Sequence, residues 1–499
     1  MFQKVLVANR GEIACRIIRT LRELGVDSVA IHSEADALAL HVRLADEAIC
    51  VGPAESTRSY LNVDAIIAAA KSTNAQAIHP GYGFLSENAD FAVACGKAGI
   101  VFIGPSETAI RTMGNKTDAR ATMIAAGVPV VPGTTEAVQS GADLIAKANE
   151  LGFPVLLKAA SGGGGKGMRQ VADESNLDRS LEAAQREAQA AFGDPDVYLE
   201  KVILAPRHIE IQILADQYGN TVHLFERECS VQRRHQKVIE ESPACNLSNE
   251  TRNAMGEIAV KGAQSIGYVG AGTFEFLVDS EENFYFLEMN TRLQVEHPVT
   301  ELVTGLDLCA LQIRIAAGEK LPFEQTQLHQ SGHAIECRIY AEDPSLNFAP
   351  SPGTLRRYRP PVGAGIRVDD GVREGDEISL YYDPMIAKLC AWADDRNTTI
   401  ARLDRALGEY AIAGIAQNVE FLRWVIRSDA FGEGRYSTDL LQNLGPYQKA
   451  VPPEEERDLM LLAGVLTHIQ SNQTKGVEQA FSTEPSRWRQ ALMPQRKPE

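Results

Sequence analysis

The sequence predicts a protein of mixed α/β and α+β class with more than one domain. Three observations lead to this prediction. The chain has 499 residues, too many for one typical domain, and should divide into about three. Strand-like and helix-like segments alternate through residues 1–114. Further along, two strand-like segments joined by a short polar turn indicate an antiparallel hairpin.

Residues 1–114 show the alternation of a doubly wound domain. We expect strands at 5–8, 28–32, 77–79 and 101–103, and helices at 12–24, 63–71 and 89–98. No G-x-G-x-x-G pattern follows the first strand, which disfavours a dinucleotide site. The glycine-containing segment 79–88 follows a strand, where open α/β sheets bind ligands. A plain structural turn is the alternative for this segment.

Residues 115 to about 330 begin with a helix and then contain two strands around a glycine run. Four successive glycines precede Lys166, and their amide groups are free to wrap an anion. This is no Walker loop, because neither Ser nor Thr follows Lys166 and the next element looks like a strand. Together with Lys158, the run indicates a phosphate-binding flap; a plain flexible hairpin is the alternative. The next predicted strand, 196–203, ends in charges and is either a nucleotide-binding hinge or a frayed surface strand.

The predicted hairpin pairs residues 272–279 with the strand that starts at Phe284. A four-residue turn would pair Asp279 with Phe284 and place Glu275 opposite Glu288. Like charges in that position repel, so a positive group should lie between them. With Asn290 alongside, the oxygen ligands suit a hard cation such as Mg²⁺. The alternative is a pair that shares a proton.

The segment that follows has polar residues at every second position. If the strand continues, five of them share one face: Glu288, Asn290, Arg292, Gln294 and Glu296. An ordinary half-buried strand is the alternative.

Residues 226–241 are dense in charges of both signs, which fits either a solvated face or a binding site. Lys237, Arg292 and Arg338 are the donors that a small oxyanion needs. Glu296 beside them could act as a base.

Residues 331–446 open with a strand at 333–340 and include a helix at 399–407. The tail differs in composition. A proline-rich and acidic segment at 452–456 leads into a candidate amphipathic helix, whose apolar stripe is Leu459, Leu462, Leu466 and Ile469. We find no internal repeat.

Composition excludes several classes of protein. Apolar residues make up 44% and charged residues 23%, as in soluble globular enzymes. The chain has no long apolar run and starts with a strand instead of a signal peptide, so we expect a cytoplasmic protein. The eight cysteines form no C-x-x-C pair, so we expect reduced, mostly buried thiols. A net charge of −17 disfavours nucleic-acid or membrane binding, so an anionic substrate requires local positive clusters.

Together these segments resemble the biotin carboxylase component of biotin-dependent carboxylases, within the ATP-grasp superfamily. The resemblance covers about residues 1–446. It rests on A-N-R-G-E-I-A at 8–14, H-P-G-Y-G-F-L-S-E-N at 79–88, the glycine run, R-R-H-Q-K at 233–237, G-A-G-T-F-E-F at 270–276, E-M-N-T-R-L-Q-V-E-H-P-V-T-E at 288–301 and H-A-I-E-C-R at 333–338. So many long motifs in order make the match specific.

The resemblance implies four regions. They are an N-terminal doubly wound, pre-ATP-grasp domain (1–114), an ATP-grasp domain (115–330) with a mobile lid at about 131–203, a C-terminal biotin carboxylase domain (331–446), and a tail or linker (447–499) that could contact a partner.

The resemblance also implies which residues bind ATP, the metal ions, bicarbonate and biotin. ATP would contact Lys116, Lys158, Gly163, Gly164, Gly165, Met168, Glu200, Lys201, Ile203, His208, Gln232 and His235. Two Mg²⁺ or Mn²⁺ ions would lie on Glu275, Glu288 and Asn290. Bicarbonate would be held by Lys237, Arg292, Gln294 and the amide of Val295, with Tyr82 near the biotin ring.

The implied reaction has two stages. Glu296 deprotonates bicarbonate, which attacks the γ-phosphate, and the resulting carboxyphosphate breaks down to carbon dioxide and phosphate. Phosphate then deprotonates the ureido nitrogen of biotin, while Arg338 stabilises the enolate. The product is carboxybiotin.

The sequence has no Met-Lys-Met biotin-attachment motif. The resemblance therefore implies that the biotin carboxyl carrier protein and the carboxyltransferase are separate chains, or that this sequence is a fragment of a larger chain. It also implies a homodimer formed through the first domain, with Arg19 and Glu23 on the interface helix. Residues 486–489 of the tail loosely resemble acyl-CoA carboxylase α chains, which indicates an acetyl-CoA or propionyl-CoA type of acceptor and a role in fatty acid metabolism.

Other functions remain open at this point. A pyruvate or other 2-oxoacid carboxylase would share these motifs. Another ATP-grasp ligase, or a nucleotide-binding module without turnover, is a more distant alternative. An inactive module should have lost Lys237, Arg292 or Glu296, and all three are present.

Overall fold

The structure is a computed structural model that describes residues 1–134, 136–159, 168–449, 458–459, 461–466 and 469. Residues 1–447 form one compact unit, and residues 448–499 form a second. Gly163, Gly164 and Gly165, to which we assigned phosphate binding, lie outside the described residues. In the second unit, the described part of the predicted amphipathic helix is helical, and its leucines are exposed.

A five-stranded parallel sheet with order β3-β2-β1-β4-β5 opens the chain. Its strands are β1 (Lys4–Val7), β2 (Asp27–Ser33), β3 (Glu47–Gly52), β4 (Ala77–His79) and β5 (Val101–Phe102). Its helices are α1 (Gly11–Glu23), α2 (Leu40–Leu44), α3 (Val63–Ser72), α4 (Ala89–Lys97) and α5 (Glu107–Gly114). The predicted doubly wound fold is confirmed. The predicted elements did not include α2, β3 and α5; the apolar run of β3, 48–51, is too short for its periodicity to distinguish a strand from a helix.

Helix α1 illustrates why these elements form. Its apolar residues Ile13, Ile17, Ile18 and Leu21 recur at helical spacing, and all four are buried. They pack with β1 residues such as Val5 in one core. Because α1 follows β1 directly, its first residues lie at the carboxyl end of the sheet, where ligands bind in open α/β folds.

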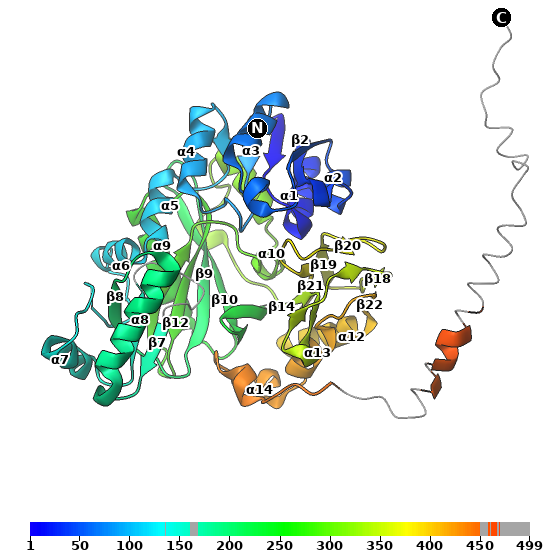
Figure 1. Cartoon of the computed structure of the whole chain (residues 1–499). Helices are drawn as coiled ribbons and strands as arrows, with labels where there is room; N and C mark the ends of the chain where they lie inside the picture. The colour runs from blue at the N-terminus through cyan, green and yellow to red at the C-terminus, as the bar shows by residue number, and fades with distance from the viewer. Residues whose placement is uncertain (135, 160–167, 450–457, 460, 467–468, 470–499) are drawn as a thin grey trace, which may run out of the picture. The chain divides into compact units, whose positions relative to one another are not determined.

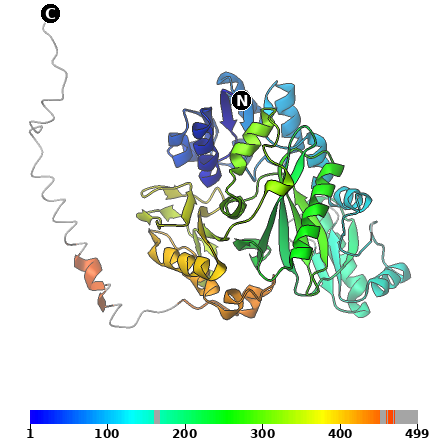
Figure 2. The same cartoon turned by 180° about the vertical axis from the view of Figure 1, so that it is seen from behind.

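A large antiparallel sheet forms the centre of the unit (Figures 1 and 2). Its order is β13-β12-β9-β10-β11-β14-β21-β19. The strands are β9 (Arg207–Ala215), β10 (Thr221–Arg233), β11 (Gln236–Ser242), β12 (Gly270–Val278), β13 (Phe284–Asn290), β14 (His333–Tyr340), β19 (Ile366–Asp370) and β21 (Met385–Ala393). The pair Ile239–Cys337 joins β11 to β14, so one sheet links the predicted second and third domains.

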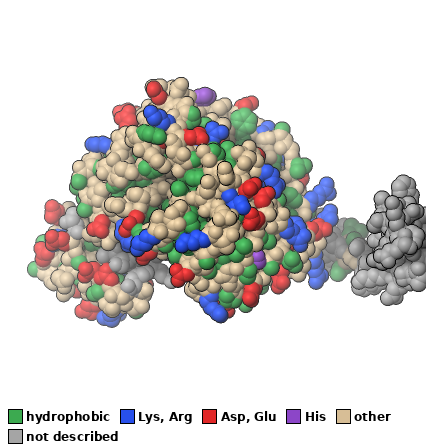
Figure 3. Space-filling model, turned by 90° about the horizontal axis from the view of Figure 1, so that it is seen from above, with side chains coloured by type: hydrophobic (Ala, Val, Ile, Leu, Met, Phe, Trp, Pro, Cys, Tyr) green, Lys and Arg blue, Asp and Glu red, His purple; other side chains and the backbone are tan. Residues whose placement is uncertain are grey.

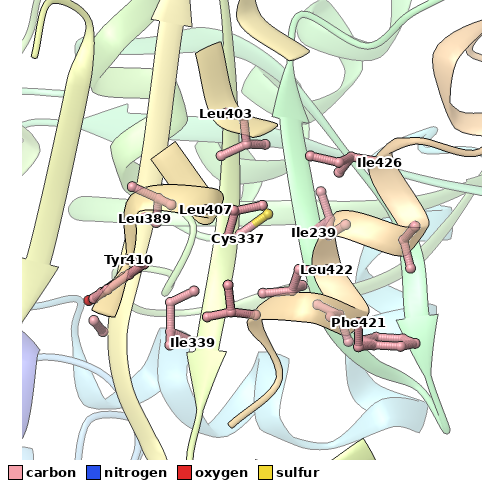
Figure 4. Packing of buried hydrophobic residues seen from close by; sticks show 14 of the residues in the cluster. Ile239, Cys337, Ile339, Leu389, Leu403, Leu407, Tyr410, Phe421, Leu422 and Ile426 are labelled. Atoms are coloured by element: carbon pink, nitrogen blue, oxygen red, sulfur yellow. The ribbon is translucent and has the colours of Figure 1, made fainter. Parts of the chain in front are cut away.

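Helices cover this sheet. They are α6 (Lys116–Ala125), α9 (Asn249–Ser265), α10 (His297–Thr304), α11 (Leu308–Ala316), α12 (Arg396–Glu409), α13 (Val419–Ile426), α14 (Asp429–Gly432) and α15 (Leu440–Asn443). Helix α9 packs on β9 and β10. Figure 4 shows Leu403 and Leu407 of α12 and Leu422 of α13 against Ile239 of β11 and Leu389 of β21. This core fixes the strands of the third predicted domain.

The unit also contains short strands and 3₁₀ turns. The short strands between residues 342 and 413 are β15 (Glu342–Asp343), β16 (Ala349–Pro350), β17 (Gly353–Thr354), β18 (Arg357–Arg359), β20 (Glu377–Ile378) and β22 (Ala411–Ala413). The 3₁₀ turns are η1 (Glu34–Asp36), η2 (Ser56–Arg58), η3 (Glu174–Asn176), η4 (Gln325–Gln327) and η5 (Pro344–Leu346).

The region predicted as a lid has its own small sheet and core. Strands β6 (Val155–Ala159), β7 (Met168–Val171) and β8 (Val197–Lys201) pair in the order β7-β6-β8. Helices α7 (Ala142–Leu151) and α8 (Leu177–Phe192) pack on them through residues such as Leu144, Leu157 and Leu181. The predicted strands on both sides of the glycine run are confirmed, whereas lid motion stays a prediction.

The hairpin of β12 and β13 differs from the prediction at its turn. Val278, and not Asp279, pairs with Phe284, so the turn is one residue longer than expected. The register then shifts between Glu275 and Phe276, where β13 carries one extra residue. This bulge cancels the error at the turn, and Glu275 lies opposite Glu288 as predicted.

The predicted extended segment 288–296 is wrong beyond Asn290. Strand β13 ends there, residues 291–296 form a loop, and helix α10 follows with Glu296 at its N-cap. The cause lies in the next residues, since Pro298 in the first turn favours a helix start. The polar residues of 292–296 therefore do not share a strand face with Glu288.

Cysteines and surface charges agree with the composition. All eight cysteines are free, and only Cys50 is exposed. Figure 3 shows acidic and basic side chains interspersed over the face that it displays. Among the described residues, no helix has both the length and the apolar character needed to cross a bilayer.

Candidate active site

A cavity of about 1010 Å³ contains most of the predicted site residues. Its lining includes Tyr82, Lys116, Lys158, Met168, Glu200, Lys201, Ile203, His208, Gln232, His235, Lys237, Glu275, Glu288, Asn290, Arg292, Gln294, Val295 and Arg338. Glu296 does not line it and lies fully buried behind Lys237 and Arg338. The fold thus gathers residues from positions 82 to 338 around one cavity.

The floor of the cavity comes from adjacent strands of the central sheet. His208 and Glu210 alternate with buried isoleucines on β9, so both point to the same face. Glu275 pairs directly with Glu210 from β12. Lys237 enters from β11. Strand pairing therefore concentrates carboxylates on one face, where a cation is needed to offset them.

Lys237 supplies that positive charge. Its Nζ atom lies 2.6 Å from Glu210 Oε2, 2.8 Å from Glu275 Oε1 and 2.7 Å from Glu296 Oε1. Burial alone would lower the pKa of Lys237, but the three carboxylates outweigh it and raise that pKa well above its ordinary value. Lys237 is therefore a fixed ammonium at the centre of the site.

Arg338 shares Glu296 with Lys237. Its Nη2 atom donates to Glu296 Oε2 at 3.0 Å, and its guanidinium also pairs with the buried Glu240 at 2.6 Å. Burial would raise the pKa of Glu296, yet Lys237 and Arg338 hold it well below its ordinary range. The carboxylate of Glu296 is thus ionised and can accept a proton.

Arg292 lies at the rim and contacts two predicted neighbours. It donates to Asn290 Oδ1 and to Gln294 Oε1, each at 2.8 Å. Its Nε atom donates to Glu87 Oε2 at 3.0 Å. Glu87 also accepts from the Thr291 amide at 2.9 Å, so the segment 79–88 fixes the loop after β13.

Glu275 and Glu288 meet the requirements of a divalent cation. Burial favours the neutral form of both carboxyls and acts to raise both pKa values. At Glu275, Lys237 and His208 outweigh burial and lower the pKa. At Glu288, the charge of Glu275 adds to burial and raises the pKa. A cation between them would remove this repulsion, and the donors are oxygens. Asn290 accepts from Arg292 here, so its oxygen would have to exchange that partner.

Lysines form the other end of the cavity. Asn115 caps helix α6 by accepting from the Thr117 and Asp118 amides, which fixes Lys116 in the first turn. Lys158 Nζ lies 3.3 Å from Glu200 Oε2. Burial and the charge of Lys158 together lower the pKa of Lys116. A half-buried and a buried ammonium group that line one cavity favour an anionic ligand such as a phosphate chain.

The charged segment 226–241 is not a solvated face. Most of it is buried, and Arg227 is fully enclosed. The Arg227 guanidinium donates to Glu210 Oε1 at 2.5 Å and to Gln212 Oε1 at 2.7 Å. The opposite charges therefore pair inside the sheet, where removing one partner would leave a buried charge.

Sequence reasoning missed Glu87, Glu210, Arg227 and Glu240. A signal for Glu210 was present, since His208, Glu210 and Gln212 alternate with three isoleucines over 208–213. Glu87 lay inside a quoted motif without an assigned role. Nothing local marked Arg227 or Glu240, because only the fold shows which charges face each other.

Family models match nearly the whole first unit. Residues 1–110 match the biotin carboxylase N-terminal domain, residues 115–324 the ATP-binding domain of the carbamoyl-phosphate synthase L chain, and residues 336–443 the biotin carboxylase C-terminal domain. The three matches follow one another in this order along the chain.

Whole proteins of known name are also similar. Biotin carboxylase 1 of Bacillus subtilis is 52% identical over 443 residues, which are 89% of this chain and 98% of that protein. The α subunit of methylcrotonoyl-CoA carboxylase from Rattus norvegicus mitochondria is 52% identical over 458 residues, 92% of this chain. The chain spans 62% of the length of that subunit.

A solved structure has the same fold. The biotin carboxylase domain dimer of Hydrogenobacter thermophilus 2-oxoglutarate carboxylase, in complex with MgADP, ADP and bicarbonate, superposes with a TM-score of 0.85 at 48% identity. The match covers 90% of this chain and all of that one. From its architecture, its cavity and these relatives, the chain belongs to the biotin carboxylase family.

Proposed function

We propose that this protein carboxylates biotin with bicarbonate at the expense of ATP and releases ADP and phosphate. One observation carries the proposal most directly. Lys237 and Arg338 line one cavity with the Glu275–Glu288 pair, and both converge on the carboxylate of Glu296, which is buried directly behind them. The arrangement offers an anion site, a base and a cation site next to one another.

The phosphates of ATP are assigned to the lysine end of the cavity. Lys116 is a half-buried cation there and Lys158 a buried one, while the carboxyl end of β8 supplies Lys201 and the amino end of β9 supplies His208. Magnesium, when bound at Glu275 and Glu288, would neutralise phosphate charge during transfer. The related domain dimer contains MgADP, which supports this assignment.

Bicarbonate is assigned to Lys237, Arg292, Gln294 and the Val295 amide. The negative charge of bicarbonate would attract the ammonium group of Lys237, which in this structure pairs with Glu296. The pKa of Glu296 would then rise towards that of a useful base as the substrate binds. Glu296 can take the bicarbonate proton, and the deprotonated oxygen attacks the γ-phosphate to give carboxyphosphate.

Biotin is assigned to the region between Arg338 and Tyr82. Carboxyphosphate would break down to carbon dioxide and phosphate, and phosphate would take the proton of the ureido nitrogen. The Arg338 guanidinium, fixed by Glu240 and Glu296, is placed to stabilise the enolate that forms. Enclosure of the site would keep water away from carboxyphosphate.

The relatives support a proposal for the acceptor and the partners. We assign the protein to an acyl-CoA carboxylase, in which a biotin carrier protein and a carboxyltransferase take over the carboxyl group. A pyruvate or 2-oxoacid carboxylase is the second candidate, favoured by the 2-oxoglutarate relative. Identification of the carboxyltransferase that co-purifies with the native protein would distinguish the two.

A homodimer through α1 is part of the proposal, as is a cytoplasmic location. Arg19 and Glu23 are exposed on α1, and Arg19 pairs with Asp370 within the same chain. Reversing the charge of both α1 residues should yield monomers if this helix forms the interface. Analytical ultracentrifugation measures the result.

ATP hydrolysis tests the proposed function as a whole. Release of phosphate should require bicarbonate and should rise when free biotin is added. Carboxybiotin should form in step with ADP. Hydrolysis that is indifferent to both bicarbonate and biotin would contradict the proposal and favour another ATP-grasp reaction.

A further inference from the structure

Lys388, on strand β21, contacts the loop 291–296 of the candidate site. Its side chain is fully buried. The Nζ atom donates to the backbone carbonyl of Val295 at 2.8 Å. It also lies 3.3 Å from Glu12 Oε1 and 3.9 Å from Asp369 Oδ2. The proposed chemistry gave this group no part.

The elements around Lys388 come from three distant parts of the sequence. Glu12 begins α1, Val295 belongs to the loop before α10, and Asp369 lies on β19. They pack closely, since a Cβ atom at Gly371 would approach the Glu12 amide nitrogen to 2.4 Å. The ammonium of Lys388 thus sits at a rigid junction.

The charge of Lys388 is secured by its neighbours. Burial alone would lower the pKa of Lys388, but Glu12, Glu336 and Asp369 outweigh it and raise that pKa above 10.5. A charged donor to a carbonyl forms a stronger hydrogen bond than a neutral one, and the bond is buried. The Val295–Glu296 peptide is therefore held firmly in one orientation.

That peptide joins two residues of the proposed bicarbonate site. The amide nitrogen of Val295, which belongs to the preceding peptide, is assigned to bicarbonate, and Glu296, whose amide nitrogen belongs to the held peptide, is the assigned base. A displacement of the held peptide would shift the Cα atoms of both residues. We propose that Lys388 is a positioning residue that fixes the loop 291–296 for bicarbonate binding, an inference that rests on the proposed function.

The test compares Lys388→Met with the wild type. The bicarbonate KM should rise about tenfold or more, as expected for losing one charge-assisted hydrogen bond. The ATP KM should stay near its wild-type value, because the lysine end of the cavity is untouched. An unchanged bicarbonate KM would overturn the inference.

A second variant separates the lost contact from the unpaired charge. Lys388→Met takes the cation away from the buried Glu12, which keeps only the Tyr82 hydroxyl as a side-chain donor among the described residues, and this could impair folding. The double variant Glu12→Gln with Lys388→Met removes that charge and should regain thermal stability while the bicarbonate KM stays high. Recovery of the bicarbonate KM in the double variant would overturn the inference. Lys320→Met, an exposed lysine, is the matched control.

The wild type distinguishes the two proposals. If its ATP hydrolysis does not depend on bicarbonate, the proposed function fails and the role of Lys388 fails with it. If the wild type depends on bicarbonate and Lys388→Met keeps the wild-type bicarbonate KM, only the positioning role fails.

Discussion

The carboxylate of Glu296 is shared between two cations, with Lys237 Nζ at 2.7 Å and Arg338 Nη2 at 3.0 Å. Such sharing keeps the group ionised before substrate arrives. It also means that Glu296 gains basicity only when an anion takes over part of the positive charge. As the proposed base, Glu296 would thus be weak without bicarbonate and strengthened when bicarbonate binds.

Replacing Glu296 tests this role. Glu296→Ala should keep ATP binding but lower bicarbonate-dependent turnover by about 10²–10⁴-fold, the usual contribution of general base catalysis. Isothermal titration with a nonhydrolysable nucleotide and a phosphate-release assay give the two readouts. Glu296→Gln preserves the shape without the base and should be equally inactive. Wild-type turnover in either variant would exclude Glu296 as the base.

Glu288 provides a second test at this scale. Glu288→Gln removes one carboxylate from the proposed cation site, so the magnesium concentration for half-maximal activity should rise about tenfold or more. Magnesium titration of the ATPase measures it. Glu281→Gln, in the exposed turn of the same hairpin, is the matched control. Equal magnesium requirements in both variants would remove Glu288 from the metal site.

At the scale of elements, register decides what the hairpin can do. The bulge in β13 restores the pairing of Glu275 with Glu288 after a turn that is one residue longer than the sequence suggested. Turn length could not be read from composition, because Asp279 closes the turn through its backbone and side chain with Asn283. The longer turn and the bulge shift the register in opposite directions, so their effects cancel at Glu275 and Glu288.

The junction of β11, β14 and α12 depends on the buried Glu241. It lies 2.7 Å from His333 Nε2 and accepts from Arg396 Nε at 2.8 Å. Burial would raise the pKa of Glu241, but His333 and Arg396 outweigh it and lower that pKa from 4.5 to about 2. A lowered folded-state pKa means that Glu241 stabilises the fold above pH 4.5 and loses this contribution as the pH falls to about 2.

Denaturation at several pH values tests the junction. The contribution of Glu241 should be about 3 kcal/mol at neutral pH, from the size of the pKa shift. The difference in unfolding free energy between wild type and Glu241→Gln should therefore shrink between about pH 4.5 and pH 2. Arg396→Leu should reduce the same pH dependence. A difference that stays constant over this window would contradict the assignment.

At the scale of the whole molecule, the cavity lies within the first unit. Every described residue that lines it falls between Asn9 and Gln442. The described residues of the second unit contribute none of them. A chain ending at Tyr447 should therefore hydrolyse ATP and carboxylate free biotin at the rate of the full chain. Loss of this activity, with folding confirmed by circular dichroism, would show that the tail serves the reaction itself.

Much of the fold could be predicted from the sequence because its signals are local. Alternating apolar runs placed β1, β4 and β14, and helical spacing placed α1 and α12. Edge strand β3 was missed because its apolar run, 48–51, is too short for its periodicity to identify a strand. The end of β13 was also missed, since period-two polarity continued into a loop whose course is set by Glu87 and Lys388.

The sequence by itself determined the family, the doubly wound first domain and the residue types that the chemistry needs, because long motifs and periodicity are written along the chain. Only the tertiary structure decided which charges meet. Lys237 faces Glu210, Glu275 and Glu296, and Lys388 reaches the carbonyl of Val295. Such pairings join residues far apart in sequence, and strand order and register, which no local pattern encodes, bring them together.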